Sequence, residues 1–417
     1  MISCALAQIF PFQPYRYSYK AGAAANLVTQ PYDKISPAMQ ARYLAASPYN
    51  LVRIILGEKS AADSDKDNAY TRAAAHLNSW IASGILEKDN SPSLYAYFQR
   101  FQVPDTGETL ERKGFIGLGA VEDYSAGVVH RHEQTLSGPK KDRLELLRHT
   151  HAHFGQIFML YPDRELAVDK LLDGAAGAGA PVTEVTDEYG ALHRMWRIAD
   201  PAVIACIQQF MADKKLLIAD GHHRYETALA LRNESPGWKA AEKVMMTFVN
   251  MHSPGLEILA THRVANRLNG FDGAALAANV RARKLGSVEE LKQMFRAPQP
   301  AKIRIGIALG SGEVYVCERE RKPGELDVKV LHEEILGRVL GITEEAVRDE
   351  KNIEYVRGLD AAYGKVREGG AQVAFLLEPT TIEQVADVAF SGGVMPQKST
   401  DFYPKLLSGM TIYKLDN

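Results

Sequence analysis

The chain has 417 residues, of which 46% are hydrophobic and 24% are charged, and this composition excludes a largely disordered protein. Its 49 basic and 51 acidic residues give a formal net charge of -2, which provides no long-range attraction to nucleic acid and disfavours that class of partner. The length predicts roughly two or three domains.

The cysteines and the apolar segments indicate the compartment. Cys4, Cys206 and Cys317 lie far apart, and a sparse odd set favours a reducing environment over a disulfide framework. The N-terminal segment has no basic start and runs into Pro11 and Pro14, so we expect an extended arm rather than a signal peptide. No apolar run is long enough to span a bilayer. We therefore expect a cytoplasmic protein without membrane contact.

The first part of the chain alternates predicted helices and strands. Ser36 and Pro37 indicate a helix start, since serine caps helices and proline suits the first helical position. The small residues over 173–181 predict a surface loop. Hydrophobic periodicity predicts helices over 37–46, 66–83, 139–153, 201–213 and 222–232, and strands over 51–56, 94–103, 111–121, 157–161, 216–219 and 243–250.

The character of the sequence changes after about residue 266, where a second set of elements begins. We predict helices near 288–296, 328–339 and 380–390, and strands near 302–309, 313–317 and 371–378. The predicted fold class is therefore α/β (α+β mixed). A core domain covers 1–265, a second α/β domain with a mixed sheet covers 266–390, and a C-terminal tail over 391–417 folds back toward the site.

The strongest chemical signal follows the apolar run at 216–219, where Asp220, Gly221, His222, His223 and Arg224 open a predicted helix. Gly221 permits a sharp turn, and the backbone amides that follow it have no intrahelical partner, so they can bind an anion. Arg224 adds a fork of donors for phosphate oxygens. Asp220 can hold a metal ion or accept a proton. Alternatively, Asp220 only caps the helix and the histidines satisfy buried backbone groups.

A second cluster of polar residues comes earlier in the chain. His132 or Glu133 can serve as a general base for a substrate hydroxyl, and Arg143, on the helix that follows, can meet a phosphate. The alternative is a solvated loop with a charged first helical turn. Tyr32 and Asp33, in a loop made rigid by Pro31, are predicted to bind substrate.

Two further segments contain candidate site residues. His262 and Arg263 end a strand-like segment and are predicted to bind substrate; the alternative is that they cap the strand end. Lys398 and Ser399 resemble the end of a phosphate-binding loop, but the Gly-Lys pairing of a Walker motif is absent. We predict that these two residues contact phosphate; the alternative is an anchoring tail.

Together, these motifs resemble the prokaryotic DUF1015 family, which is named for a domain of unknown function. The matching segments are Asp220-Gly-His-His-Arg-Tyr-Glu226, Gly255 through Thr261-His-Arg263, His132-Glu-Gln-Thr135 with Asp142-Arg143, Met395-Pro-Gln-Lys-Ser-Thr400 with Phe402 through Lys405, Pro31-Tyr-Asp33 and Asn50-Leu-Val-Arg53. Ala260 stands where the family usually has proline. The Asp-Gly-His-His-Arg box is also similar to the phosphate-binding box of the ParB and sulfiredoxin superfamily. That likeness implies a ParB/sulfiredoxin-like nucleotide-binding core, and the superfamily includes kinases of free serine.

We therefore predict a small-molecule phosphotransferase, a nucleotide-dependent kinase for free serine or a similar hydroxyl metabolite. ATP or ADP would place its phosphates on the amides of Gly221 to His223 and on Arg224, Asp220 would place Mg²⁺, and Glu133 would activate the acceptor. Two alternatives stay open. One is a nucleotide-binding switch without turnover, and the other is a metal-dependent hydrolase that uses His130, His132, His222, His223 and His262. A homo-oligomer is also compatible with the sequence.

Overall fold

The computed structural model describes residues 7–104, 106–133 and 137–415, so Cys4, Gln134 and Thr135 lie outside the described residues. The chain forms two compact units, the first comprising residues 1–256 and 404–417 and the second comprising 257–403. The predicted boundaries at 265 and 391 therefore need correction. Strands β13 (Glu257–Leu259) and β20 (Asp401–Tyr403) pair with each other inside the second unit, and only the segment after them returns to the first.

A nine-stranded sheet forms the centre of the first unit, in the order β6-β11-β8-β12-β5-β4-β10-β9, with β1 paired to β5. β11 runs parallel to β6 and β12 runs parallel to β8, whereas the other neighbours are antiparallel, so the sheet is mixed. The strands are β1 (Ile9–Phe10), β4 (Leu94–Gln102), β5 (Thr109–Ala120), β6 (Val129–His130), β8 (Ile157–Tyr161), β9 (Thr183–Thr186), β10 (Leu192–Ile198), β11 (Leu216–Asp220) and β12 (Lys243–Asn250).

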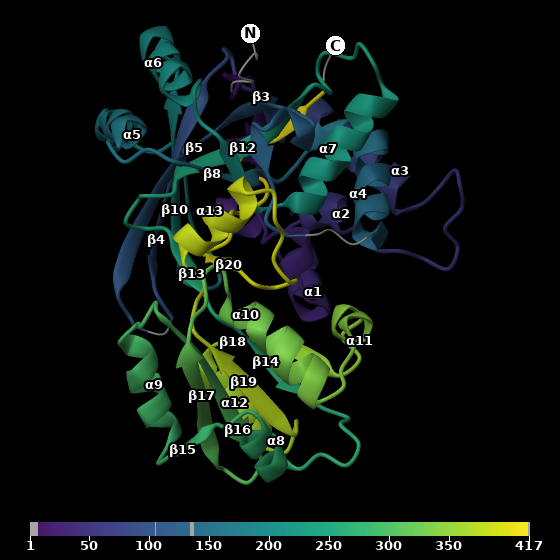
Figure 1. The fold of residues 1–417 in the computed structure, drawn as a ribbon. Helices are drawn as coiled ribbons and strands as arrows, with labels where there is room; N and C mark the ends of the chain where they lie inside the picture. Colours follow the sequence, from purple (N-terminus) through teal and green to yellow (C-terminus); the bar gives the residue numbers. More distant parts are fainter. Residues whose placement is uncertain (1–6, 105, 134–136, 416–417) are drawn as a thin grey trace. The chain divides into compact units, whose positions relative to one another are not determined.

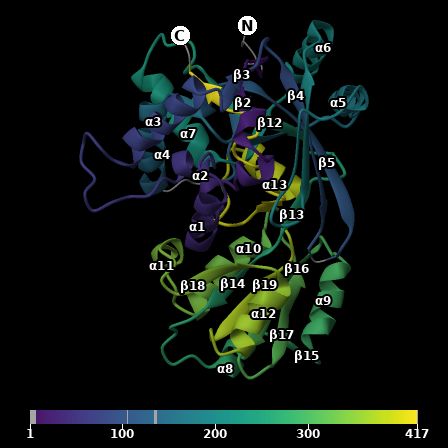
Figure 2. The ribbon, with the colours of Figure 1, turned by 180° about the vertical axis from the view of Figure 1, so that it is seen from behind.

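Helices in the first unit form two groups. Figures 1 and 2 both show α3, α4 and α7 gathered on one side, and α5 and α6 together on the other. The helices are α1 (Pro37–Ala46), α2 (Val52–Ile55), α3 (Ala69–Ala82), α4 (Ser137–Thr150), α5 (Ala167–Gly177), α6 (Pro201–Met211) and α7 (His222–Glu234). Short pairings of β2 (Tyr15–Tyr17) with β3 (Leu86–Lys88) and of β7 (Ala152–His153) with β21 (Tyr413–Lys414) complete the unit.

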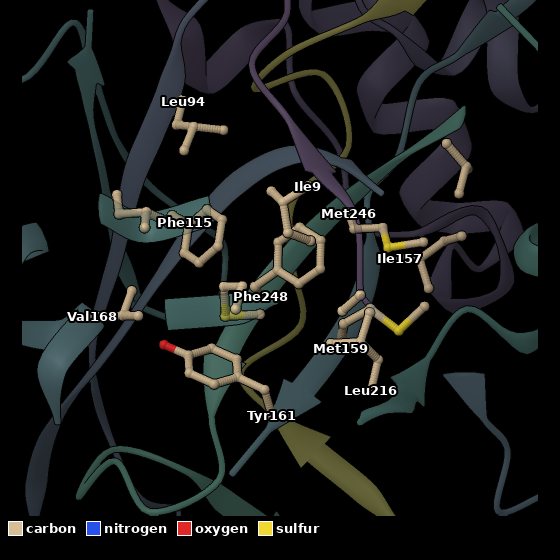
Figure 3. Close-up of a cluster of buried hydrophobic side chains, with 14 of the residues drawn as sticks. Ile9, Leu94, Phe115, Ile157, Met159, Tyr161, Val168, Leu216, Met246 and Phe248 are labelled. Carbon is tan, nitrogen blue, oxygen red and sulfur yellow. The ribbon is translucent and has the colours of Figure 1, made fainter. Parts of the chain in front are cut away.

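One face of the large sheet carries the main apolar core (Figure 3). Alternate residues of a strand point to the same face, so Ile157, Met159 and Tyr161 of β8 all enter this core. Met246 and Phe248 of β12 join them, and the ring of Phe248 stacks on Phe115 of β5 at 4.9 Å between centroids. The opposite face also has apolar residues, among them Phe158 and Leu160, but it includes the buried polar side chains of Gln99 and Arg112.

The segment around the strongest predicted motif has the expected local structure. β11 is an interior strand between β6 and β8, and α7 begins at His222, directly after Gly221. Two other predictions were wrong. Residues 52–55 form helix α2 instead of a strand, and their buried side chains belong to a core with α3. Residues 173–177 end helix α5 instead of forming a loop, since alanine favours helix and Val168 and Leu172 anchor that helix in the core.

The second unit is built on a six-stranded sheet with the order β15-β17-β16-β19-β14-β18. It was expected to be mixed, but every pairing within it is antiparallel among the described residues. The strands are β14 (Thr261–Ala265), β15 (Arg283–Leu285), β16 (Lys302–Leu309), β17 (Val314–Glu320), β18 (Ile353–Arg357) and β19 (Val373–Leu377). The helices are α8 (Gly273–Asn279), α9 (Val288–Arg296), α10 (Asp327–Val330), α11 (Glu344–Arg348), α12 (Leu359–Arg367) and α13 (Ile382–Phe390), with a π-helix at Leu331–Val339. Of the helices in the described ranges, none has the length and apolarity needed to cross a membrane.

Candidate functional site

The turn between β11 and α7 has the geometry of an anion-binding helix start. Gly221 has a φ of 96°, in the left-handed region where glycine alone is unstrained. The first intrahelical hydrogen bond runs from the amide of Tyr225 to the carbonyl of Gly221 at 2.9 Å. The amides of His222, His223 and Arg224 therefore precede the helical ladder and point out of its positive end.

Arg224 folds back over this turn. A Cβ atom at Gly221 would lie 3.0 Å from both Nε and Nη2 of Arg224, so the guanidinium occupies the space that a side chain would need. Its Nη1 donates to the carbonyl of Gln156, and its Nη2 lies 3.7 Å from Oδ1 of Asp220. Two features therefore favour glycine at position 221: the positive φ angle, and the close approach of the Arg224 guanidinium.

Asp220 is surrounded by cations. Nζ of Lys405 lies 3.4 Å from its Oδ2, whereas Arg224 approaches its Oδ1. Burial by itself would raise the pKa of Asp220, but Lys405, Arg224 and Lys34 more than offset this and hold the pKa well below its usual range. Asp220 is thus a permanent anion and a poor general base near neutral pH.

This environment does not fit a resident Mg²⁺ ion. Divalent cations are held by several oxygen ligands, often carboxylates, whereas the carboxylate of Asp220 already pairs with lysine and arginine. Among the residues that the structure describes, no group of three His, Cys, Asp or Glu side chains could hold a metal ion. The metal role predicted for Asp220 and the metal-dependent hydrolase therefore find no support in this geometry.

Two buried histidines lie beside the turn. The rings of His132 and His222 meet edge to face at 4.8 Å, and Nδ1 of His132 donates to the carbonyl of Ile218 at 2.8 Å. Burial lowers the pKa of His132 to about 4 and that of His222 well below its ordinary value, so both rings are neutral. Within the described part of the chain, Nε2 of His222 has no hydrogen-bond partner although the residue is 92% buried.

Glu133 differs from these histidines in its exposure. Its side chain is 22% exposed, and its Oε1 lies 4.0 Å from Nε2 of the fully buried His132. Of the three residues predicted to be catalytic, Glu133 and Asp220 each have a side chain that is 22% exposed, whereas that of His132 is fully buried.

A hollow next to the turn brings two predicted phosphate ligands together. Arg224 and Arg143 both line a cavity of about 60 Å³, which has room for several waters or a small anion. Tyr32, Gly155, Thr227 and Ser408 also line it. The guanidinium of Arg143 lies 4.2 Å above the ring of Tyr32, and its Nη1 donates to the carbonyl of Ile55 at 2.6 Å. Burial raises the pKa of Tyr32 to about 12, whereas Asp33 beside it is exposed to solvent.

Four predicted site residues lie in the second unit, where they make contacts of their own. Nδ1 of His262 accepts from the amide of Leu377 at 3.1 Å. The buried guanidinium of Arg263 donates to the carbonyls of Gln397 at 3.2 Å and Lys398 at 3.0 Å. Lys398 is exposed and has a φ of 56°, whereas Ser399 is buried. Their predicted roles in substrate and phosphate binding remain predictions.

Sequence patterns missed several residues of the first unit's site. Lys405 was quoted only as the end of a motif, and Gln156 and Ser408 were not singled out. No local pattern links these three residues to Asp220, since long-range packing brings them there, whereas Thr227 lies on α7 itself. Gln156 was the hardest to find, because it is a single polar residue directly before the apolar strand β8.

A family model described as a protein of unknown function (DUF1015) matches residues 9–362. The chain belongs to the DUF1015 family. Among curated proteins, none matches this DUF1015 chain.

The chain is weakly similar to several solved structures, three of which follow. A mutant of a free serine kinase with bound ADP is 12% identical, with a TM-score of 0.36 over 66% of this chain and 84% of that one. A conserved hypothetical protein from Pyrococcus furiosus is 14% identical, with a TM-score of 0.36 over 69% and 92%. C-terminally truncated SbnI from Staphylococcus aureus is 14% identical, with a TM-score of 0.34 over 70% and 85%.

Proposed function

We propose that this DUF1015 chain is a nucleotide-dependent phosphotransferase whose phosphate site is the start of α7 and the adjoining hollow. One observation carries the proposal: the guanidinium of Arg224 lies against the turn at Gly221 and also lines the cavity that Arg143 lines. A phosphate in this position would meet two guanidinium groups at the positive end of a helix, and both features favour anions.

Phosphoryl transfer needs positioned phosphates and neutralised charge more than it needs covalent help from the protein. Arg224, Arg143 and the amides at the start of α7 would provide both. The partly exposed Glu133 would take the proton from the acceptor hydroxyl, for which free serine or a similar cytoplasmic metabolite is the proposed source. ATP or ADP is the proposed donor, and any divalent ion would enter with its phosphates, since Asp220 is engaged by cations.

A screen of nucleotide consumption tests this proposal. The full chain is incubated with ATP or ADP and a panel of hydroxyl metabolites that includes serine, and phosphorylated products are identified by mass spectrometry. We expect turnover with one acceptor class, and we expect Glu133→Gln to lose turnover while it still binds the nucleotide. Failure of the parent protein to bind ATP, ADP or inorganic phosphate in calorimetry would refute the proposal.

A nucleotide-binding switch without turnover is the second candidate. The neutral histidines and the permanently ionised Asp220 favour it, because none of these three groups is a strong base near neutral pH. Binding of a nucleotide without consumption, whatever acceptor is offered, would establish the switch and rule out the phosphotransferase.

A further inference from the structure

Lys405 lies at the candidate phosphate site although it is far from it in sequence. Its side chain is only 8% exposed, and its Nζ lies 3.4 Å from Oδ2 of Asp220, the residue directly before Gly221. The strongest charged influences on Asp220 are Lys405, Arg224 and Lys34, all of them cations. Three cations therefore act on this one carboxylate, and Lys405 is the first of them.

The backbone around Lys405 is held by polar side chains of the large sheet. Nη2 of Arg112 on β5 donates to the carbonyl of Pro404, and Nε2 of Gln99 on β4 donates to the carbonyl of Lys405 at 2.9 Å. The amide of Leu407 donates to the hydroxyl of Tyr97, also on β4, at 3.4 Å. Three successive points on the returning chain are therefore fixed to two neighbouring strands.

These holding residues are themselves buried and connected to each other. Nε of Arg112 donates to Oε1 of Gln99 at 3.0 Å, and the hydroxyl of Tyr97 lies 2.7 Å from Nδ1 of His193. Arg112 and Gln99 are each 1% exposed. Burial lowers the pKa of Arg112 to about 9, which reflects how unfavourable it is to enclose a guanidinium. The opposite face of β4 and β5 is apolar, so a polar layer is not an inevitable feature of these strands.

A buried charge often contributes little to stability compared with apolar packing, and its best-supported use is to specify an arrangement. The buried charge here is Arg112. It specifies the path of the backbone over residues 404–407, and this path determines where the Lys405 ammonium lies. We propose that Lys405 is an anion-binding residue of the β11–α7 site, and that Arg112 and Gln99 are positioning residues that hold its ammonium beside Asp220. This inference rests on the proposed function, because the anion is the phosphate of the bound nucleotide.

The free and bound states would differ in what Lys405 contacts. Without ligand, the ammonium pairs with Asp220, which keeps a desolvated charge satisfied. When a phosphate binds at the start of α7, the ammonium would lie between Asp220 and the new anion and add one charge-assisted contact. Asp220 is then a positioning residue too, since it keeps Lys405 in place before the ligand arrives.

Lys405→Met tests the charge, because methionine approximates the length and apolar stem of lysine. Calorimetric titration with ADP, and separately with inorganic phosphate, should show affinity reduced about tenfold or more, as loss of one charge-assisted contact requires. Lys405→Arg should recover part of that loss. Lys239→Met is the matched control, since Lys239 is an exposed lysine paired to Glu242 at 3.0 Å, and it should bind both probes as the parent does.

The salt dependence of ADP binding separates a charge contact from a structural effect. Affinity of the parent should fall more steeply with added salt than affinity of Lys405→Met, because the variant has one fewer cation to screen. Gln99→Glu keeps an acceptor for Arg112 but removes the donor to the Lys405 carbonyl, and it should weaken ADP binding at least about threefold. If Lys405→Met does not fold, Gln99→Glu still tests the inference.

Two results would overturn the inference. One is a folded Lys405→Met that binds ADP with the affinity and salt dependence of the parent, and the other is a folded Gln99→Glu with parental affinity, which would remove the positioning role. If Arg224→Ala weakens binding while Lys405→Met does not, this inference fails and the proposed function stands. If the parent binds neither ADP nor inorganic phosphate, both fail.

Discussion

The two units use the same residue types in opposite ways. At the β11–α7 turn of the first unit, Arg224 lines a hollow and Nε2 of His222 has no partner among the described residues. In the second unit, His262 accepts a backbone amide and Arg263 donates to backbone carbonyls around it. Histidine and arginine next to each other are therefore not a functional signal by themselves. The two places differ in that Nε2 of His222 has no partner among the described residues, whereas Nδ1 of His262 accepts a backbone amide.

The largest expected effect is a loss of stability in the second unit, and it tests whether Arg263 has a structural role. Arg263→Ala should lower the free energy of unfolding by about 3 kcal/mol or more, because it removes a buried guanidinium that donates to the backbone carbonyls of Gln397 and Lys398. Urea unfolding followed by circular dichroism measures the loss. A variant that is as stable as the parent but has lost ADP affinity would show that Arg263 is a ligand-binding residue after all.

Acid should destabilise the first unit through its buried histidines. Burial lowers the pKa of His132 from an ordinary value of about 6.5 to about 4, so the folded state favours the neutral ring. The stability that this provides is present above pH 6.5 and is lost as the pH falls toward 4, by up to roughly 3 kcal/mol.

The control for this pH dependence is His132→Asn, whose amide can still donate to the carbonyl of Ile218 but does not titrate in this range. Chemical unfolding of the parent and of the variant is compared at several pH values from 7 to 4 (about one pH unit apart is sufficient for a transition of this width). Identical pH profiles for the two proteins would contradict the assignment.

Arg224→Ala should affect binding more than folding, which is the reverse of Arg263→Ala. Loss of one charge-assisted contact should weaken ADP binding by about 1.5–3 kcal/mol, or roughly tenfold or more. The free energy of unfolding should change less than the free energy of ADP binding, because Asp220 keeps Lys405 as its partner. Calorimetry and thermal unfolding on the same samples check both parts. Unchanged affinity for ADP and for inorganic phosphate would mean that this arginine is structural.

The smallest expected effect concerns Lys398. Its φ of 56° places a side chain in the left-handed region, which costs about 1 kcal/mol for a residue other than glycine. Lys398→Gly should therefore leave stability unchanged or raise it by up to about 1 kcal/mol, since relief of strain offsets the added flexibility of the unfolded chain. A simultaneous fall in ADP affinity would support the predicted phosphate contact of Lys398, whereas unchanged affinity would leave it as a loop residue.

The sequence alone was sufficient for the strand-turn-helix around Asp220. An apolar run specified β11, Gly221 was needed for a positive φ, and the polar residues after it could only lie at an exposed turn or a helix start. These are properties of a dozen consecutive residues, so local physical chemistry decides them. The same was true of Ser36 and Pro37, which open α1 as predicted.

Elements with ambiguous local signals were decided by packing. The apolar residues of 52–55 suit a strand or a buried helix equally well, and contact with α3 selected the helix. The domain boundaries depended on the pairing of β13 with β20, two segments far apart in the chain. Periodicity within a short window contains no information about such a partner.

The charge environment of the site also came from tertiary structure alone. The sequence indicated that Asp220 and Arg224 are neighbours, because they follow one another at a turn. Only the folded chain puts Lys405 beside the same carboxylate, where Arg112 and Gln99 donate hydrogen bonds to the returning backbone. A local motif can therefore identify where an anion could bind, whereas the long-range contacts of the fold decide which charges are present there.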